Sequence, residues 1–374
     1  MTQETFPPNT TQLRLGEGHK VEEDTDGKLF FNEFVDLSRK LEKTRSVLHN
    51  AGDIGVGTTP NEIVLDAKMY RLLHYRPMVS RTAKTPVLVV YALINKSYIL
   101  DLQPDKSWIR NLLNQGFDIY LIDWKTPNQV DKYVSFDDYV NGYIDDCVEF
   151  VRTKSSIDKL TLHGYCMGAT MSVIYTTLHQ DKIRNLATIA PVFDAEKDVT
   201  VLANFSKHID GEKILNFVGN LPYEQLYACY SALKPFKQGV NKYFNLVENI
   251  DNEEFVQNFL RIEKWLYDTP PIAGETFRQW VVDIYQKNLL AANEMKIGSE
   301  VVDLSKIQIP LLNIVAEEDH LVSPQCSAPL NDAVSSLDKR LMRFHTGHVG
   351  LIASSYSQNN VLPKVGQWIK ARSQ

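Results

Sequence analysis

The feature that most constrains the fold of this chain is a Gly-Tyr-Cys-Met-Gly segment at residues 164–168. It follows Leu160–His163, a short apolar run typical of a buried strand, and it precedes Ala169–Leu178, which has the composition of a helix. Glycines two positions on either side of Cys166 let the backbone turn sharply and pass close to its neighbours. This arrangement predicts a nucleophile elbow, a turn between strand and helix that lifts a reactive side chain above the sheet, with cysteine in place of serine.

From Pro60 onward the chain alternates between short β-branched runs and helical stretches. Besides the strand before the elbow, we predict strands at Pro86–Ile94, Phe117–Asp123, Leu186–Ala190, Leu311–Val315 and Arg340–Phe344. Helical spacing predicts helices at Ser107–Gln115, Phe136–Thr153 and Val361–Lys370. Strands that alternate with helices form a mostly parallel sheet with right-handed crossovers, so we expect an α/β architecture.

The chain divides, in this interpretation, into four parts. They are a polar, helical N-terminal arm over residues 1–59, a first part of the core over 60–200, a cap insertion over 201–300 and a second part of the core over 301–374. Within the arm, Phe30–Leu48 has helical spacing, and a flexible hinge follows at Gly52–Gly57. Residues 201–290 have no clear strand run but hold 15 of the chain's 38 aromatic residues (17 Tyr, 16 Phe and 5 Trp). Such enrichment is also typical of core packing, but we predict a helical cap over the edge where α/β folds bind ligands.

Composition excludes several classes of protein. The chain has 374 residues, a formal charge of −6 and 44% hydrophobic residues, which is typical of a globular protein and not of a nucleic-acid-binding one. The longest apolar run, Val87–Ile94, is well short of the ~20 residues needed to span a membrane, and no secretory signal is visible. The cysteines have no paired spacing, so we expect no disulfide, no metal and a cytoplasmic location; they are Cys147, Cys166, Cys229 and Cys326.

A nucleophilic cysteine needs a base, and the base needs an acid that orients it. Asp319 follows the predicted strand Leu311–Val315, and His348 lies in a Gly-His-Val-Gly segment after Arg340–Phe344. Nucleophile, acid and base follow one another in this order in elbow folds, and the 29 residues between Asp319 and His348 suit one intervening helix. The sequence therefore predicts a catalytic triad of Cys166, Asp319 and His348.

Other residues compete for two of these roles. His345 lies close to His348, which we favour because flanking glycines place it in a loop that can reach across the site. Glu317 and Glu318 compete with Asp319, which we favour because an apolar pair and a turn follow it. For the remaining candidates we expect packing or surface roles only; they are His163, His320, Cys147, Cys229 and Cys326.

Two backbone N–H groups are expected to bind the oxyanion of an acyl-transfer reaction. The first is that of Met167, at the start of the helix whose dipole also favours a Cys166 thiolate. The second comes from the turn after the early strand, where we nominate Ile94, with Leu93 as the alternative. Loss of one such donor typically raises the barrier by about 2.7–4 kcal/mol.

Together these motifs resemble those of a polyhydroxyalkanoate (PHA) synthase. Ile94–Pro104 (INKSYILDLQP) resembles the signature of that family after its early strand, and Asp118–Trp124 resembles its next strand. The cysteine elbow and the segments 318–320 and 347–350 match the positions of its triad, and the resemblance covers residues 57–370. The family usually has a second glycine directly after the elbow, where this chain has alanine.

The resemblance implies an α/β-hydrolase fold with a mostly parallel sheet, helices on both faces and a helical cap insertion. It implies that the substrate is an (R)-3-hydroxyacyl-coenzyme A, most often the 3-hydroxybutyryl form, and that Cys166 carries the acyl group as a thioester. The polymerase needs no cofactor beyond this coenzyme A thioester substrate. The short chain resembles class III and class IV enzymes, so we expect a second, non-catalytic subunit. We also expect a homodimer, a growing polyester chain and a location at polyester granules in the cytoplasm.

Three other functions remain open. A dienelactone-hydrolase-like esterase also uses a cysteine elbow, but such a chain would lack the long insertion. An acyl-coenzyme A thioesterase would differ only in admitting water to the acyl-enzyme. An inactive, granule-associated scaffold would not need Cys166, Asp319 and His348 together.

Overall fold

The computed structural model describes residues 25–50, 52, 54–233 and 241–373, which form two compact units with a boundary after Asn50. The first unit contains helix α1 (Thr25–Asn50), which includes the helix predicted at Phe30–Leu48. Part of the predicted hinge, residue 53, lies outside the described residues. The boundary precedes residue 59 because Gly57 and Thr59 already belong to the second unit: their N–H groups donate to Asp101, over 2.9 and 2.8 Å.

The second unit is built on one eight-stranded sheet in the order β1-β2-β6-β3-β7-β8-β11-β12. Its strands are β1 (Asn61–Asp66), β2 (Tyr70–Tyr75), β3 (Val87–Val90), β6 (Ile119–Trp124), β7 (Leu160–Tyr165), β8 (Ile183–Ile189), β11 (Leu311–Ala316) and β12 (Lys339–Phe344). The six strands from β6 to β12 run parallel, and β1 and β2 extend the sheet as an antiparallel hairpin. The mostly parallel sheet predicted from the sequence is confirmed.

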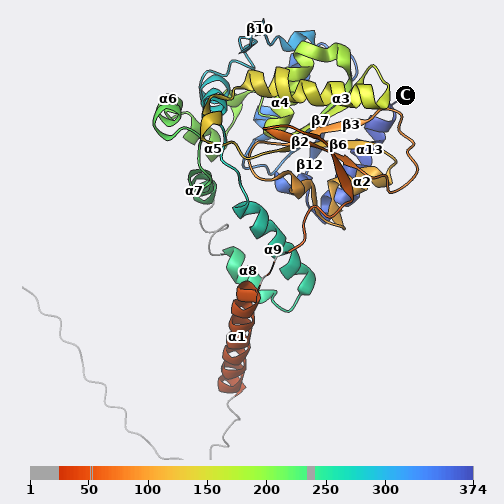
Figure 1. Ribbon diagram of the computed structural model, residues 1–374. Helices are drawn as coiled ribbons and strands as arrows, with labels where there is room; N and C mark the ends of the chain where they lie inside the picture. Colours follow the sequence, from red (N-terminus) through yellow and green to blue (C-terminus); the bar gives the residue numbers. More distant parts are fainter. Residues whose placement is uncertain (1–24, 51, 53, 234–240, 374) are drawn as a thin grey trace, which may run out of the picture. The chain divides into compact units, whose positions relative to one another are not determined.

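Helices cover both faces of this sheet, as predicted. Figure 1 shows α3 (Asp145–Ser155) and α4 (Met167–His179) on one face, and α2 (Trp108–Asn114) and α13 (Leu362–Lys370) on the other. A π-helical turn, η3 (Asp138–Ile144), leads into α3. Along the chain, helices α11 (Pro324–Ser327) and α12 (Leu330–Ala333) connect β11 to β12. Two short hairpins lie outside the main sheet: β4 (Asp101–Gln103) pairs with β5 (Lys106–Ser107), and β9 (Lys296–Ile297) pairs with β10 (Glu300–Val301).

One strand prediction was too long. The apolar run Pro86–Ile94 pairs in the sheet only from Val87 to Val90, and residues 91–94 leave the sheet as a loop that is buried over residues 91–93. The carbonyl of Tyr91 accepts a hydrogen bond of 2.8 Å from the Trp124 indole instead of a strand partner. An apolar run indicates burial, but it does not show where ladder hydrogen bonds stop.

The described part of residues 201–290 is mainly helical. It contains α5 (Val201–Ser206), α6 (Gly211–Lys213), η6 (Ile214–Val218), α7 (Tyr223–Leu233), α8 (Lys242–Glu248), α9 (Glu253–Tyr267), α10 (Gly274–Gln279) and the π-helical η8 (Trp280–Gln286). This insertion has a small apolar cluster of its own, formed by Leu221, Leu226, Ile272, Phe277 and Val281.

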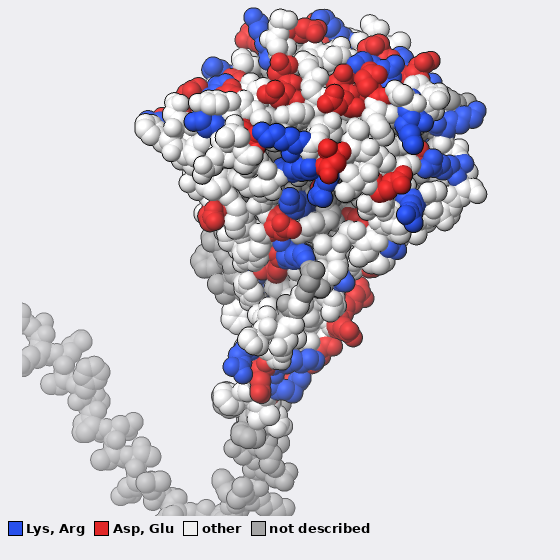
Figure 2. All heavy atoms as spheres, in the orientation of Figure 1, with Lys and Arg blue, Asp and Glu red and all other residues white. Residues whose placement is uncertain are grey.

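Charges of both signs are mixed over the surface. Figure 2 shows basic and acidic side chains interspersed over the face of the second unit that is in view. Among the described residues, no helix combines the length and the apolar character that a membrane span requires.

Candidate active site

Cys166 lies on the sharp turn that the glycine pattern predicts. It joins β7 to α4 with φ 55° and ψ −124°, a left-handed conformation that is strained for any residue with a side chain. A Cβ atom on Gly168 would lie 2.2 Å from the Val90 carbonyl oxygen, and one on Gly164 would lie 2.4 Å from Cα of Ala169. Only glycine therefore fits at either position. The alanine at 169 is fully buried, and its N–H donates to the carbonyl of Cys166 over 2.9 Å.

The structure brings Asp319 and His348 together. The His348 Nδ1 lies 2.6 Å from Oδ2 of Asp319, and both side chains are buried. The other oxygen, Oδ1, accepts the backbone N–H groups of Leu321 and Val322 over 2.8 and 3.0 Å. Burial by itself raises the pKa of Asp319, but the His348 ring and these N–H groups outweigh it, so the pKa is lowered and the carboxylate stays charged.

His348 also interacts with Cys166. Burial alone lowers the pKa of His348. The opposite effect is larger: the charge of Asp319, the Cys166 side chain and the hydrogen bonds of His348 to these two residues together raise its pKa well above the usual value. Since Nδ1 faces Asp319, Nε2 is the nitrogen that remains for Cys166. The ring of Tyr165 lies 5.1 Å from the His348 ring, and its hydroxyl donates to the His348 carbonyl over 3.5 Å. Sequence reasoning missed this support, for which the elbow pattern contains no signal.

The competing acids and base lie elsewhere. His345 is 79% exposed, and its Nδ1 lies 3.0 Å from Glu317 and 3.9 Å from Glu318. His345 therefore faces both glutamates at the surface.

The other candidates have packing roles. His163 is buried, stacks on Trp108 and donates from Nδ1 to the Ala187 carbonyl over 3.0 Å; burial lowers its pKa to about 4, so it is neutral. Burial raises the pKa of the thiols of Cys147 and Cys326 well above the usual value, which makes both unreactive. The side chain of Cys229 lies outside the described residues.

The two predicted oxyanion donors lie in segments that meet. Met167 is the first residue of α4, where backbone N–H groups have no partner within the helix. Ile94 and Leu93 lie in the loop after β3, which pairs with β7 in parallel, so the loop and the elbow leave the sheet at the same edge. The close approach of Gly168 to the end of β3 brings the two segments into contact.

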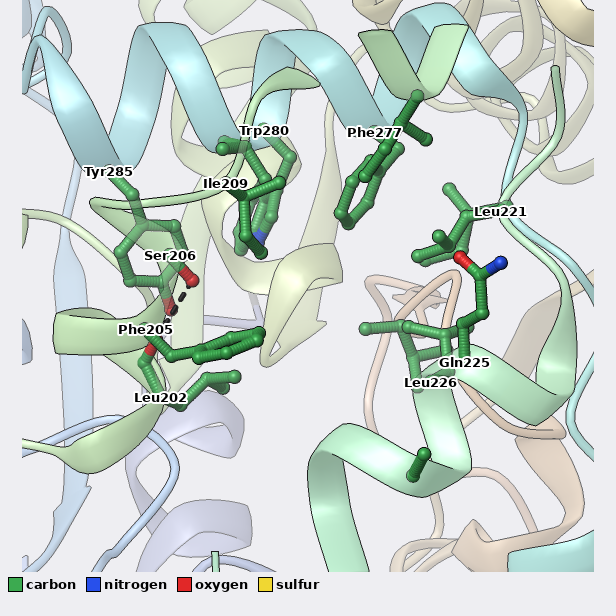
Figure 3. A pocket seen from close by; sticks show the side chains of 15 residues that line it. Leu202, Phe205, Ser206, Ile209, Leu221, Gln225, Leu226, Phe277, Trp280 and Tyr285 are labelled. Atoms are coloured by element: carbon green, nitrogen blue, oxygen red, sulfur yellow. Dashed lines mark hydrogen bonds between the residues drawn. The ribbon is translucent and has the colours of Figure 1, made fainter. Parts of the chain in front are cut away.

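A largely apolar cavity of about 380 Å³ lies within the insertion and reaches the loop after β3. Figure 3 shows α5 with Leu202 and Phe205 and η8 with Trp280 and Tyr285 on one side, and Leu221 and α7 with Gln225 and Leu226 on the other. The remaining lining residues are Ile94, Ser206, Ile209, Ile214, Ala228, Ile272, Phe277 and Val281. Ile94, whose backbone N–H is a predicted oxyanion donor, therefore forms part of the cavity wall.

Comparison with solved structures bears on the fold. The structure resembles the monoacylglycerol lipase of Paleococcus ferrophilus with a TM-score of 0.52 at 18% identity, over 80% of this chain and 99% of the lipase. It resembles MenH from S. aureus with the same TM-score of 0.52 at 16% identity, over 82% and 100% of the two chains. At these identities the likeness shows the fold alone.

Sequence comparisons are more specific. A family model of the alpha/beta hydrolase fold matches residues 85–354, and one described as the poly-beta-hydroxybutyrate polymerase (PhaC) N-terminus matches residues 24–112. The chain is 41% identical to the poly(3-hydroxyalkanoate) polymerase subunit PhaC of Allochromatium vinosum, over 91% of this chain and 96% of that protein.

Two further relatives carry the same name. The PhaC subunit of Haloferax mediterranei is 44% identical over 86% of this chain and 66% of its own length, and that of Synechocystis sp. is 37% identical over 86% and 87%. The α/β-hydrolase fold is thereby confirmed, and the chain belongs to the PhaC family of poly(3-hydroxyalkanoate) polymerases, of the class III or class IV type.

Proposed function

We propose that this chain polymerises (R)-3-hydroxyacyl-coenzyme A, with the 3-hydroxybutyryl form as substrate, and that Cys166, His348 and Asp319 form its catalytic triad. The observation that carries the proposal is the buried pair of His348 and Asp319, which lie 2.6 Å apart. The His348 ring also interacts with Cys166 on the strained elbow. Membership of the PhaC family supports the reaction type.

In the first half-reaction the enzyme is acylated. His348 takes the thiol proton of Cys166 through Nε2, and the thiolate attacks the carbonyl carbon of the acyl thioester. The resulting oxyanion is held by the N–H groups of Met167 and Ile94, or Leu93. The carbon–sulfur bond to coenzyme A then breaks, and the departing thiolate takes the proton from His348. One thioester replaces another, so this step is close to balanced in free energy.

In the second half-reaction a polyester bond forms. The 3-hydroxyl of an acyl unit gives its proton to His348 and attacks the acyl group on Cys166. The carbon–sulfur bond breaks, the Cys166 sulfur takes the proton back, and an ester remains. A hydroxyl is a much weaker nucleophile than a thiolate, so this step depends more strongly on a base oriented by Asp319.

The acyl-enzyme must also be protected from water, since water would release a free acid. The cavity between α5, α7 and η8 supports this part of the proposal, because most of its lining is apolar. We assign to it the acyl chain, and to the insertion the role of a cap.

The proposed partners follow from the relatives. Several of them are named as polymerase subunits, so we propose that this chain works with a second, non-catalytic subunit. A homodimer and a cytoplasmic location at the surface of a polyester granule belong to the same proposal.

The decisive experiment is Cys166→Ala, assayed with (R)-3-hydroxybutyryl-coenzyme A while coenzyme A, polymer and free acid are measured separately. We expect release of coenzyme A to fall by roughly 10⁴-fold or more with the fold intact. Cys147→Ala removes a buried thiol outside the site and should retain release. Full release by Cys166→Ala would contradict the mechanism, free acid alone from the wild type would indicate a thioesterase, and no release at all would indicate a scaffold.

A further inference from the structure

The loop after β3 is held by two different parts of the molecule. At its start the Trp124 indole donates to the Tyr91 carbonyl over 2.8 Å, and beyond its end the Ser97 hydroxyl donates to Asp123 over 2.7 Å. Both partners are on β6 and therefore belong to the sheet. Residues 92–96, which include the candidate oxyanion donors, lie between these two anchors.

The third anchor comes from the insertion. Nδ2 of Asn95 donates to the Trp265 carbonyl over 3.2 Å and to the hydroxyl of Thr269, just beyond the end of α9. In return the Trp265 indole donates to the Lys96 carbonyl over 2.9 Å. The Trp265 carbonyl is in the last turn of α9, where carbonyls have no partner within the helix. The loop and the helix therefore complete each other's hydrogen bonds.

The same residue sets the course of the backbone. Asn95 has φ 62°, in the left-handed region that asparagine tolerates better than most residues. Since Asn95 directly follows Ile94, its conformation sets the direction in which the backbone continues after the 93–94 segment. A loop held there by α9 presents its N–H groups in one direction.

Helix α9 is itself firmly fixed. The Trp265 side chain is buried in the main core, and Ile262 and Leu266 pack against it. Arg261 donates from Nε to the Gly55 carbonyl over 3.0 Å and from Nη1 to Gln103 over 3.3 Å. These contacts let α9 act as a rigid support for the loop.

We propose that Asn95 and Trp265 are positioning residues that make the oxyanion hole depend on the docking of α9. With α9 docked, the 93–94 segment supplies the second N–H donor, and Cys166 can be acylated. When the contacts of Asn95 and Lys96 with α9 are broken, the donor is misplaced and the acylation of Cys166 slows. The inference rests on the proposed function of Cys166.

The test compares two reactions of Cys166 in the full chain. Acylation by (R)-3-hydroxybutyryl-coenzyme A needs an oxyanion hole, whereas alkylation by iodoacetamide needs only the nucleophile. Asn95→Asp keeps the shape and the left-handed preference but replaces the Nδ2 donor with an acceptor that faces the Trp265 carbonyl. We expect kcat for the release of coenzyme A to fall roughly 10- to 100-fold, while KM stays within about twofold of the wild-type value. The rate of alkylation should also stay within about twofold of wild type.

Two further variants complete the design. Trp265→Phe removes the donor to the Lys96 carbonyl without adding charge and should lower the same kcat in the same selective way. Asn293→Asp is the matched control: Asn293 has φ 58°, and its Oδ1 accepts from Leu304 N–H over 2.9 Å, which a carboxylate does equally well. It should acylate at the wild-type rate.

Unchanged acylation in both Asn95→Asp and Trp265→Phe would overturn the inference. Equal losses of acylation and alkylation would also overturn it, because they would indicate a general collapse of the site. Failure of the proposed function looks different: Cys166→Ala would then still release coenzyme A, whatever the variants of Asn95 do.

Discussion

Asp319 uses both of its oxygens, and its replacement therefore has a defined consequence. In Asp319→Asn the amide oxygen can still accept the N–H groups of Leu321 and Val322, but its NH₂ group then faces Nδ1 of His348. That contact favours the His348 tautomer that carries its proton on Nε2. In this tautomer Nε2 cannot take the proton of a nucleophile. A thiol ionises partly near neutral pH without help, whereas a hydroxyl does not. We expect elongation to fall about 10²- to 10⁴-fold and acylation much less.

The measurement separates the first release of coenzyme A in a single turnover from the rate of polymer growth. Asp338→Asn is a suitable control, because the Asp338 carboxylate forms a half-exposed ion pair with Arg372, at 2.6 Å, and is no part of the proposed site. It should leave both rates unchanged. Equal losses of acylation and elongation in Asp319→Asn would contradict the role of an orienting acid.

Which site residues can be predicted from sequence depends on how local their signal is. The elbow is marked by two glycines around Cys166, and the order of acid and base along the chain restricts the choice of Asp319 and His348. The contact between Asn95 and Trp265 joins residues 170 positions apart, and no pattern near either residue indicates it. Such contacts depend on how whole helices and loops pack against one another, and this packing cannot be predicted from a local sequence pattern.

Among the elements, the buried parallel strands were the easiest to predict, because burial on both faces leaves a continuous apolar run. The hairpin of β1 and β2 was missed. β1 lies at the edge of the sheet, has no buried residue and contains a half-exposed Ile63, so its pattern is neither alternating nor continuous. At residues 91–94 the error was the opposite one: a strand was predicted because the segment is apolar, but the segment has no strand partner.

The insertion can be tested through the cavity that its helices form. Leu226 is buried in the wall of the cavity, and Leu226→Asn keeps a similar size while adding groups that bind water. We expect the fraction of substrate released as free 3-hydroxybutyrate to rise at least about threefold, with acylation of Cys166 retained. The products are quantified by chromatography after complete consumption of the substrate.

A control for this variant exists outside the site. Leu337 is fully exposed, so Leu337→Asn makes the same exchange without touching the cavity, and its products should match those of the wild type. If Leu226→Asn also gave the wild-type ratio of polymer to acid, the cavity would have no part in excluding water.

For the whole molecule, the question is where the catalytic unit begins. Every residue assigned to the proposed site lies in the unit that starts at residue 51, and the sheet and its main core lie there too. A chain starting at residue 51 should therefore fold cooperatively and acylate Cys166 within about threefold of the full chain. A severe loss of acylation would show that α1 contributes to the chemistry.

A chain starting at residue 60 should behave differently, because it lacks Thr59. The backbone N–H and the hydroxyl of Thr59 donate to the Asp101 carboxylate over 2.8 and 2.6 Å, and Asp101 is only 1% exposed. Ser107 would remain as a donor, at 2.6 Å, but the buried charge would lose two of its hydrogen bonds. Each buried group left unpaired typically costs about 1–3 kcal/mol, so thermal unfolding should occur several degrees lower than in the chain starting at residue 51. Equal melting temperatures would mean that the catalytic unit begins at the first strand and that residues 51–59 add no stability to it.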